Sequence, residues 1–134
     1  MQDLIRTVLV VEDEDGVRNL IRTLFRLEGF DVISCQDGVE ALDLMQARGG
    51  NIHLVVTDLN LGPYMDGIEL AENLRTVYPS VKVLFISGEE EEGRLGREVA
   101  GGRAFFLKKP FTPRGLTEKA KAILAMAPVI SVSR

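Results

Sequence analysis

The chain has 134 residues, of which 20 are acidic and 16 are basic, so its formal net charge is −4 at pH 7. This length suits one domain with a single core, and the acidic balance argues against nucleic acid as a partner of this domain. No apolar run approaches the ~20 residues that span a bilayer, and the N-terminus lacks the pattern of a secretion signal. We therefore expect a cytoplasmic protein without a membrane partner. The one cysteine, Cys35, excludes an internal disulfide and is expected to be a small buried side chain.

Strand-like apolar runs alternate with helical periods in the first half of the chain. Residues 8–11 form a continuous apolar run, as in a strand that is buried on both faces. Residues 32–33 predict a second strand, and residues 39–47 predict a second helix. Between the two strands lies a first helix that stops near Gly29, with arginines on one side and an apolar stripe of Val17, Leu20, Ile21, Leu24 and Leu27.

The same alternation continues in the second half. Three more strands are predicted, at residues 54–57, 83–86 and 104–107. Three helices are predicted with them: one at residues 68–77, a weak one within residues 90–100, and one that Thr112 caps and Pro113 opens, with the stripe Leu116, Ala120, Ile123 and Leu124.

Five strands that alternate with five helices predict an α/β fold with a doubly wound parallel sheet and right-handed crossovers. For five strands the flavodoxin-like order 2-1-3-4-5 is the natural choice, and its switch point lies between strands one and three. We expect this domain to occupy residues 1–127, with residues 128–134 as a C-terminal tail.

Charged and polar side chains stand where the predicted strands end. These are Glu12, Asp13, Asp58, Ser87 and Lys109. Because the carboxyl ends of parallel strands meet at one edge of the sheet, these side chains should lie together. Three converging carboxylates repel one another unless a cation joins them, and their hard oxygen atoms suit Mg²⁺. The set fits phosphoryl transfer, with Asp58 as acceptor and with Lys109 and Ser87 contacting the phosphoryl oxygens.

Five segments in this order resemble a response-regulator receiver domain over residues 7 to about 127. They are Val-Leu-Val-Val-Glu-Asp-Glu at 8–14, Val-Val-Thr-Asp-Leu-Asn-Leu at 55–61, Met-Asp-Gly at 65–67, Phe-Ile-Ser-Gly at 85–88 and Lys-Lys-Pro-Phe at 108–111. The resemblance implies a protein that catalyses only its own aspartyl phosphorylation and dephosphorylation. Its expected partners are a histidine kinase or histidine phosphotransfer protein and a downstream protein. The output surface would be formed by helix four, strand five and helix five.

The resemblance also assigns roles to single residues. Asp58 would be the phosphoacceptor, Glu12 and Asp13 the acidic pair for Mg²⁺, and Asn60 a metal ligand through its backbone carbonyl. Ser87 would be the switch hydroxyl and Phe106 would stand at the aromatic switch position. The site lysine would be Lys109 rather than Lys108, because the family's lysine directly precedes a proline, and this peptide bond is expected to be cis. Asn60 and Glu89 would govern the approach of water to the phosphoryl group.

Two features depart from the commonest receiver pattern. The loop at residues 59–64 is one residue longer, so its path is left open, and Phe106 stands where many members have a tyrosine. Two other functions stay open as alternatives: a binding module that works without phosphorylation, and a Mg²⁺-dependent phosphohydrolase. The chain could equally be a single-domain regulator or a receiver from a larger protein, such as a hybrid histidine kinase. His53 is expected to be structural.

Overall fold

The computed structural model describes residues 5–88 and 104–126, which alternate between strands and helices as predicted. The elements are β1 Thr7–Val11, α1 Asp15–Leu27, β2 Asp31–Cys35, α2 Gly38–Ala47, β3 Leu54–Asp58, α3 Gly67–Val77, β4 Lys82–Ser87, β5 Ala104–Lys108 and α5 Pro113–Ala125. Four of the five predicted helices therefore lie in the described residues. The helix predicted within residues 90–100 and the tail at residues 128–134 lie outside them.

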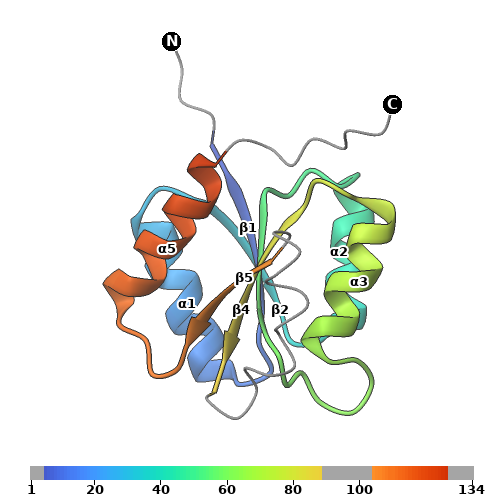
Figure 1. The fold of residues 1–134 in the computed structure, drawn as a ribbon, viewed down its shortest axis with the longest axis horizontal. Helices are drawn as coiled ribbons and strands as arrows, with labels where there is room; N and C mark the ends of the chain where they lie inside the picture. The colour runs from blue at the N-terminus through green and yellow to red at the C-terminus, as the bar shows by residue number, and fades with distance from the viewer. Residues whose placement is uncertain (1–4, 89–103, 127–134) are drawn as a thin grey trace.

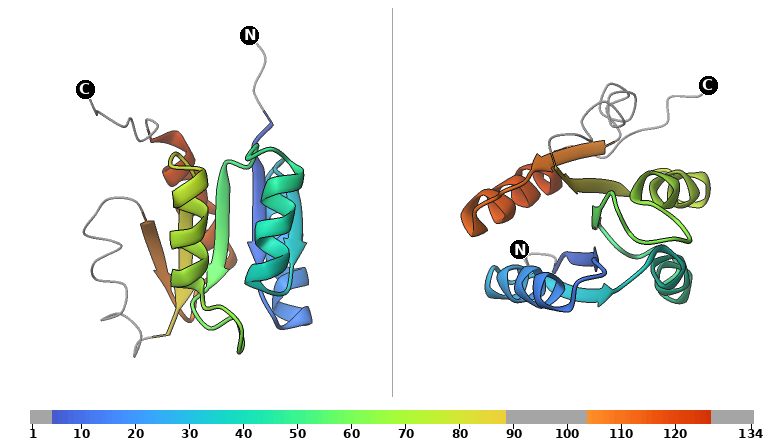
Figure 2. Two further views of the ribbon diagram at one scale, coloured as in Figure 1. Left: turned by 90° about the vertical axis from the view of Figure 1, so that its right-hand side faces the viewer. Right: turned by 90° about the horizontal axis from the view of Figure 1, so that it is seen from below.

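The strands form one parallel sheet in the order β2-β1-β3-β4-β5, which confirms the predicted topology. Helices α1 and α5 cover one face of this sheet, and α2 and α3 cover the other (Figures 1 and 2). β1 and β3 are neighbours in the sheet, and the predicted switch point lies between them, because the chain adds β2 on one side of β1 and the later strands on the other side. The carboxyl ends of all five strands point to the lower edge in Figure 1, where the predicted site residues are placed.

Each face of the sheet has its own apolar core. Val8 and Val10 of β1 pack with α1 and α5, whereas Leu9 and Val11 pack with α2 and α3. Side chains alternate between the two faces along a strand, and both faces of β1 are covered, so all four side chains are buried. Each large side chain that is buried in this way contributes about 1.5–3 kcal/mol to the free energy of unfolding. The continuous apolar run in the sequence is therefore explained by helices on both faces.

The apolar stripe predicted for α1 is only partly buried. Ile21 and Phe25, which are four residues apart on one line of the helix, are its buried side chains. Leu20 is 50% exposed and Leu27 is 77% exposed, so this part of the predicted stripe does not face the core. Val17 and Leu24 are partly buried against the core, whereas the rotation of about 100° per residue turns Leu20 and Leu27 away from it.

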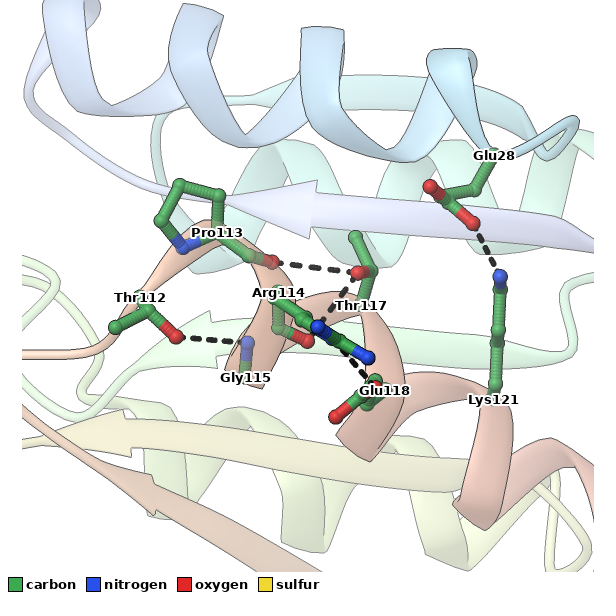
Figure 3. A network of polar contacts seen from close by, with 8 residues as sticks. All are labelled: Glu28, Thr112, Pro113, Arg114, Gly115, Thr117, Glu118 and Lys121. Carbon is green, nitrogen blue, oxygen red and sulfur yellow. Dashed lines mark hydrogen bonds and ion pairs between the residues drawn. The ribbon is translucent and has the colours of Figure 1, made fainter.

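The N-terminus of α5 is capped as the sequence predicts. The Thr112 hydroxyl accepts a hydrogen bond from the Gly115 N–H at 2.9 Å, and Pro113 occupies the first turn (Figure 3). Further along α5, Lys121 forms an ion pair with Glu28 at the end of α1. The Thr112 cap fixes the start of α5 a few residues after β5, and the ion pair holds α5 beside α1.

The loop between β3 and α3 is anchored by its own apolar side chains. Leu59 and Leu61 are buried, and Gly62 adopts a φ of +98°, which favours glycine. The loop closes where the Gly67 N–H donates to the Leu59 carbonyl at 2.8 Å. Asp66 then caps α3 in a capping box with Glu69, so the helix begins beside the end of β3.

Gly67 is expected to be essential for this close approach of α3 to β3. A Cβ atom at this position would lie 2.4 Å from the backbone oxygen of Asp58, which cannot move without shifting the strand end. We expect Gly67→Ala to lower the free energy of unfolding by about 1–3 kcal/mol, measured by urea denaturation.

Gly16→Ala in α1 is the matched control, because a Cβ atom there would meet nothing within 4 Å. Since alanine favours a helix over glycine by up to about 1 kcal/mol, this variant should be as stable as the wild type or more stable. Equal stability of the two variants would contradict the role given to Gly67.

Candidate functional site

The structure brings the predicted lysine and the predicted acceptor together at the carboxyl edge of the sheet. Lys109 Nζ lies 2.8 Å from Asp58 Oδ2. Asp58 ends β3 and is only 8% exposed, while Lys109 follows β5 directly. The Lys109 N–H also donates to the Ser87 carbonyl at 2.8 Å, which ties this segment to the end of β4. Three strand ends are thus joined around one carboxylate.

The Asp58 carboxylate is held from both of its oxygen atoms. Oδ2 pairs with Lys109, and Oδ1 accepts a hydrogen bond from the backbone N–H of Asn60 at 3.0 Å. The hydroxyl of Thr57 donates to the Asp58 backbone carbonyl at 2.8 Å. Each carboxylate oxygen has a further lone pair, so the group stays open to a metal ion or an electrophile while its orientation is fixed. Asn60 itself lies at the exposed rim.

Glu12 is the buried member of the acidic pair. It is 4% exposed, whereas Asp13 is exposed. Burial is the largest influence and raises the pKa of Glu12 to about 7, although the Glu14 N–H at 3.1 Å favours the charged form. A hydrogen bond with Asp13 and the negative charges of Asp58 and Asp13 raise this pKa further. The three acids therefore interact electrostatically, as expected for groups that face one crevice.

Ser87 is fully buried, and its hydroxyl has no hydrogen-bond partner among the described residues. A buried hydroxyl without a partner costs about 1–3 kcal/mol, and such groups are rare in folded proteins. Ser87 ends β4, which is hydrogen-bonded to β3 with Asp58 opposite Ile86. The hydroxyl is therefore an unsatisfied donor at the end of the strand next to the one that carries the candidate acceptor.

The other site predictions have mixed outcomes. The Lys109–Pro110 peptide bond is cis, as predicted. Lys108 is exposed. Phe106 is half-buried against the core on the α2–α3 face, so the aromatic position is occupied by a packed ring. Glu89 lies outside the described residues. His53 has a structural partner, because its Nδ1 accepts a hydrogen bond from the Thr7 N–H at 2.9 Å.

Arg18 belongs to this region, although the sequence suggests only an exposed face. One of its Nη atoms donates to the Glu12 carbonyl at 2.9 Å, and the other pairs with Asp15 at 2.5 Å. The guanidinium thus supports the loop that carries the acidic pair. The sequence could indicate only the pair with Asp15, because the two residues are three apart on a predicted helix. It could not indicate the contact of Arg18 with Glu12.

No three His, Cys, Asp or Glu side chains within residues 5–88 and 104–126 are grouped closely enough to hold a metal ion as they stand. The donor set is nevertheless that of a hard cation, because Glu12, Asp13 and Asp58 supply carboxylate oxygens and Asn60 supplies a carbonyl. These residues fit Mg²⁺ by their chemistry.

The fold and the site together define a doubly wound α/β domain with a buried, lysine-paired aspartate at its switch point. A family model of the response regulator receiver domain matches residues 8–121. The chain belongs to this family. It is therefore a signalling module of the two-component type, a class that works with histidine kinases and downstream effectors. No helix in the described parts of the chain is long and apolar enough to cross a membrane.

The chain is similar to parts of several characterised proteins. It is 38% identical over 118 residues to the sensor kinase CckA of Brucella abortus and 37% identical over 120 residues to the aerobic respiration control protein ArcA of Escherichia coli. These alignments cover 88% of this chain but only 12% of CckA and 48% of ArcA. A chemotaxis protein CheY homolog of Campylobacter jejuni is 32% identical, with 91% of its length covered.

Solved structures show the same fold. The receiver domain of NtrX from Brucella abortus has a TM-score of 0.81 and 28% identity, with 90% of this chain and 99% of that one covered. A receiver domain protein from Clostridium thermocellum has a TM-score of 0.83 at 21% identity, with 90% and 94% covered, and supports the fold alone.

The raised pKa of Glu12 predicts a pH-dependent stability of the metal-free protein. Between pH 4.5 and about 7 the folded state binds more protons than the unfolded state, so the contribution of Glu12 to stability falls as pH rises. We expect Glu12→Gln to unfold with about 1–3 kcal/mol more free energy than the wild type at pH 8, and the difference to vanish near pH 4.5.

Urea denaturation in EDTA across this pH range measures the effect. The control is Glu72→Gln, because Glu72 is exposed on α3 and should leave the pH profile unchanged. A constant difference between Glu12→Gln and the wild type at every pH would show that burial does not raise the pKa of Glu12.

Proposed function

We propose that the protein is a phosphoacceptor switch in a two-component phosphorelay. Asp58 receives a phosphoryl group from a histidine kinase or a histidine phosphotransfer protein, with Mg²⁺ bound beside it. Two observations carry this proposal: the Lys109–Asp58 pair at 2.8 Å, and the buried Ser87 hydroxyl at the end of the neighbouring strand β4, which has no hydrogen-bond partner among the described residues. A purely structural ion pair does not account for a buried hydroxyl without a partner at the same edge of the sheet.

The proposed transfer begins with Asp58 as the nucleophile. One carboxylate oxygen forms a bond to phosphorus while the phosphorus–nitrogen bond of the donor phosphohistidine breaks, and the electron pair stays on the imidazole nitrogen, which then takes up a proton. Mg²⁺, when held by Glu12, Asp13, Asp58 and the Asn60 carbonyl, would supply positive charge at the transferring phosphoryl group. The protein contributes mainly position and charge.

Lys109 and Ser87 then stabilise the product. The phosphoryl group brings a charge of about −1.5 to −2, so the ammonium that now pairs with Asp58 would pair with the phosphoryl oxygens instead. The Ser87 hydroxyl gains the acceptor that it lacks in this structure. We expect Ser87 to move toward these oxygens, and Phe106, which is half-buried on the neighbouring strand β5, to turn into the space that Ser87 leaves. The proposed output region is the surface of β5, α5 and the helix predicted within residues 90–100.

Neither alternative function is favoured by an observation. A binding module that works without phosphorylation does not need the retained set of acids, hydroxyl and lysine. A phosphohydrolase needs in addition a cap that binds its substrate, and the elements in residues 5–88 and 104–126 include none beyond those of the sheet and its covering helices. A relative of nearly this length and relatives of much greater length both exist, so the length of the whole protein stays open.

An apolar groove beside Lys109 suits the phosphoryl donor. It has a volume of about 540 Å³ and is lined by Val17 and Leu20 of α1 and by Lys109, Pro110, Phe111 and Pro113. The donor histidine must reach Asp58, and a groove that shares Lys109 with the site places its occupant within reach. We propose that a helix of the kinase or phosphotransfer protein packs here, with the half-exposed Leu20 as an apolar anchor.

Phosphorylation of Asp58 can be tested directly. Acetyl phosphate with Mg²⁺ should add one phosphoryl group to the wild-type protein, and Asp58→Asn should add none, because the amide is not a nucleophile of the same kind. Intact-mass spectrometry measures both. Equal labelling of the two proteins would place the acceptor elsewhere.

The metal requirement is tested in the same assay. EDTA should abolish labelling of the wild type, and Asp13→Ala should need much more Mg²⁺ for the same labelling, because it removes an accessible carboxylate ligand. Labelling that is independent of Mg²⁺ would contradict the metal site while leaving Asp58 as the acceptor.

The groove can be tested by comparing two phosphoryl donors. Leu20→Glu should slow transfer from a phosphorylated histidine kinase by about tenfold or more, since a charge replaces a buried apolar contact. Labelling by acetyl phosphate should be unchanged, because a small donor does not need the groove. The kinase is found by screening autophosphorylated kinases against the wild-type protein.

Val77→Glu is the matched control, because Val77 is 65% exposed on α3, on the other face of the sheet. If both variants accept phosphoryl groups from the kinase as fast as the wild type, the donor does not dock on this groove.

A further inference from the structure

A basic cavity lies at the end of the sheet opposite Asp58. Its volume is about 310 Å³, and it is formed where the start of β1, the segment before β3, the start of β4 and the C-terminus of α5 meet. This is the upper edge in Figure 1, where α5 ends. The cavity is lined by three bases, Arg6, His53 and Lys82, and by the polar residues Asn51 and Ser80. No described residue in its lining is acidic.

Lys82 is the buried centre of this basic cluster. The residue is only 8% exposed, although lysine is almost never fully buried without a partner. Its Nζ donates to the carbonyls of Ile123 at 3.0 Å and Met126 at 2.9 Å. An ammonium group has three N–H donors, so one of them stays available to a ligand in the cavity.

Arg6 and His53 present further donors to the same space. Arg6 Nη1 donates to the Leu124 carbonyl at 3.4 Å, which uses one of the five N–H groups of its guanidinium. His53 accepts the Thr7 N–H at Nδ1, so its Nε2 carries the proton and is a donor. Donors from three separate segments therefore surround one cavity.

Arg6 and Lys82 also have a structural role, because both bind carbonyls at the C-terminus of α5. A helix C-terminus carries only about half a negative charge. Two full positive charges exceed it, and no carboxylate in the described lining makes up the difference. The pKa values of His53 and Lys82 are accordingly lowered, first by burial and then by the positive charge of Arg6. Capping of α5 therefore leaves excess positive charge in the cavity.

We propose that this cavity binds a small oxyanion, of the phosphate or carboxylate class, between Arg6, His53 and Lys82. The planar guanidinium of Arg6 suits the paired oxygens of such a group, and the Lys82 ammonium supplies a second positive charge. The volume is at the small end of ligand pockets, so a compact anion fits within the cavity. The site is separate from the phosphoryl site, at the opposite edge of the sheet.

The bound anion would also strengthen the attachment of α5. Arg6 and Lys82 would each contact the anion and an α5 carbonyl at once, so the ion would tie β1, β4 and the end of α5 together. Since α5 is part of the proposed output surface, the concentration of the anion would influence that surface without any change at Asp58.

The test is a titration of the ¹⁵N-labelled full chain with inorganic phosphate, followed by nuclear magnetic resonance in EDTA. We expect saturable shifts of the amide signals of Arg6, Thr7, His53, Lys82 and Leu124. Arg6→Gln should weaken binding about tenfold, because it removes a charge-assisted hydrogen bond. Arg6 is chosen because Lys82 binds two carbonyls at the end of α5, those of Ile123 and Met126, so its loss would also disturb this part of the fold.

Arg114→Gln is the matched control, since it removes one arginine from the exposed N-terminal turn of α5 and should leave phosphate affinity unchanged. Sodium chloride at equal ionic strength controls for screening of charge. The proposal is overturned if the shifts are not saturable, if sodium chloride reproduces them, if they occur only around Lys109, or if Arg6→Gln binds phosphate as tightly as the wild type.

Discussion

The ion pair between Lys109 and Asp58 is the interaction on which the arrangement of this protein depends. It joins the end of β3 to the segment after β5, two strands that are separated in the sheet by β4. A buried carboxylate is stable only with a counter-charge or with hydrogen bonds, and Asp58 has both, from Lys109 and from the Asn60 N–H. A phosphoryl group on Asp58 would take over the same lysine, so the contact that holds the resting state is the one that the proposed reaction changes.

The two edges of the sheet carry side chains of opposite charge. At the carboxyl edge, acids gather and one lysine offsets part of their charge, so the site favours a further cation. At the amino edge, Arg6 and Lys82 gather around the end of α5 with no acid in the described lining, so the cavity favours an anion. The parallel sheet produces this separation, because all strands begin at one edge and end at the other.

Helix α1 leaves an apolar side chain exposed beside the candidate site. Its buried line of Ile21 and Phe25 is enough to hold it on the sheet, and Leu20 is left half-exposed at the groove beside Lys109. A helix that needed all of its apolar residues for the core would have no apolar side chain to offer a partner. The exposure of Leu20 is therefore what would make this helix available to the proposed phosphoryl donor.

The strand order, most element positions, the Thr112 cap and the candidate residues at the strand ends could all be predicted from the amino-acid sequence. These follow from local periodicity and from the rule that parallel strands end at one edge, which need no knowledge of side-chain packing. The folded structure was needed to show that Leu20 and Leu27 are exposed, that Leu59 and Leu61 anchor the longer loop, and that Arg18 contacts the Glu12 carbonyl. It alone brought Arg6, His53 and Lys82 to one cavity. Such contacts depend on the orientation of each helix about its axis and on the path of each loop. Both are determined by packing between residues that are distant in the chain.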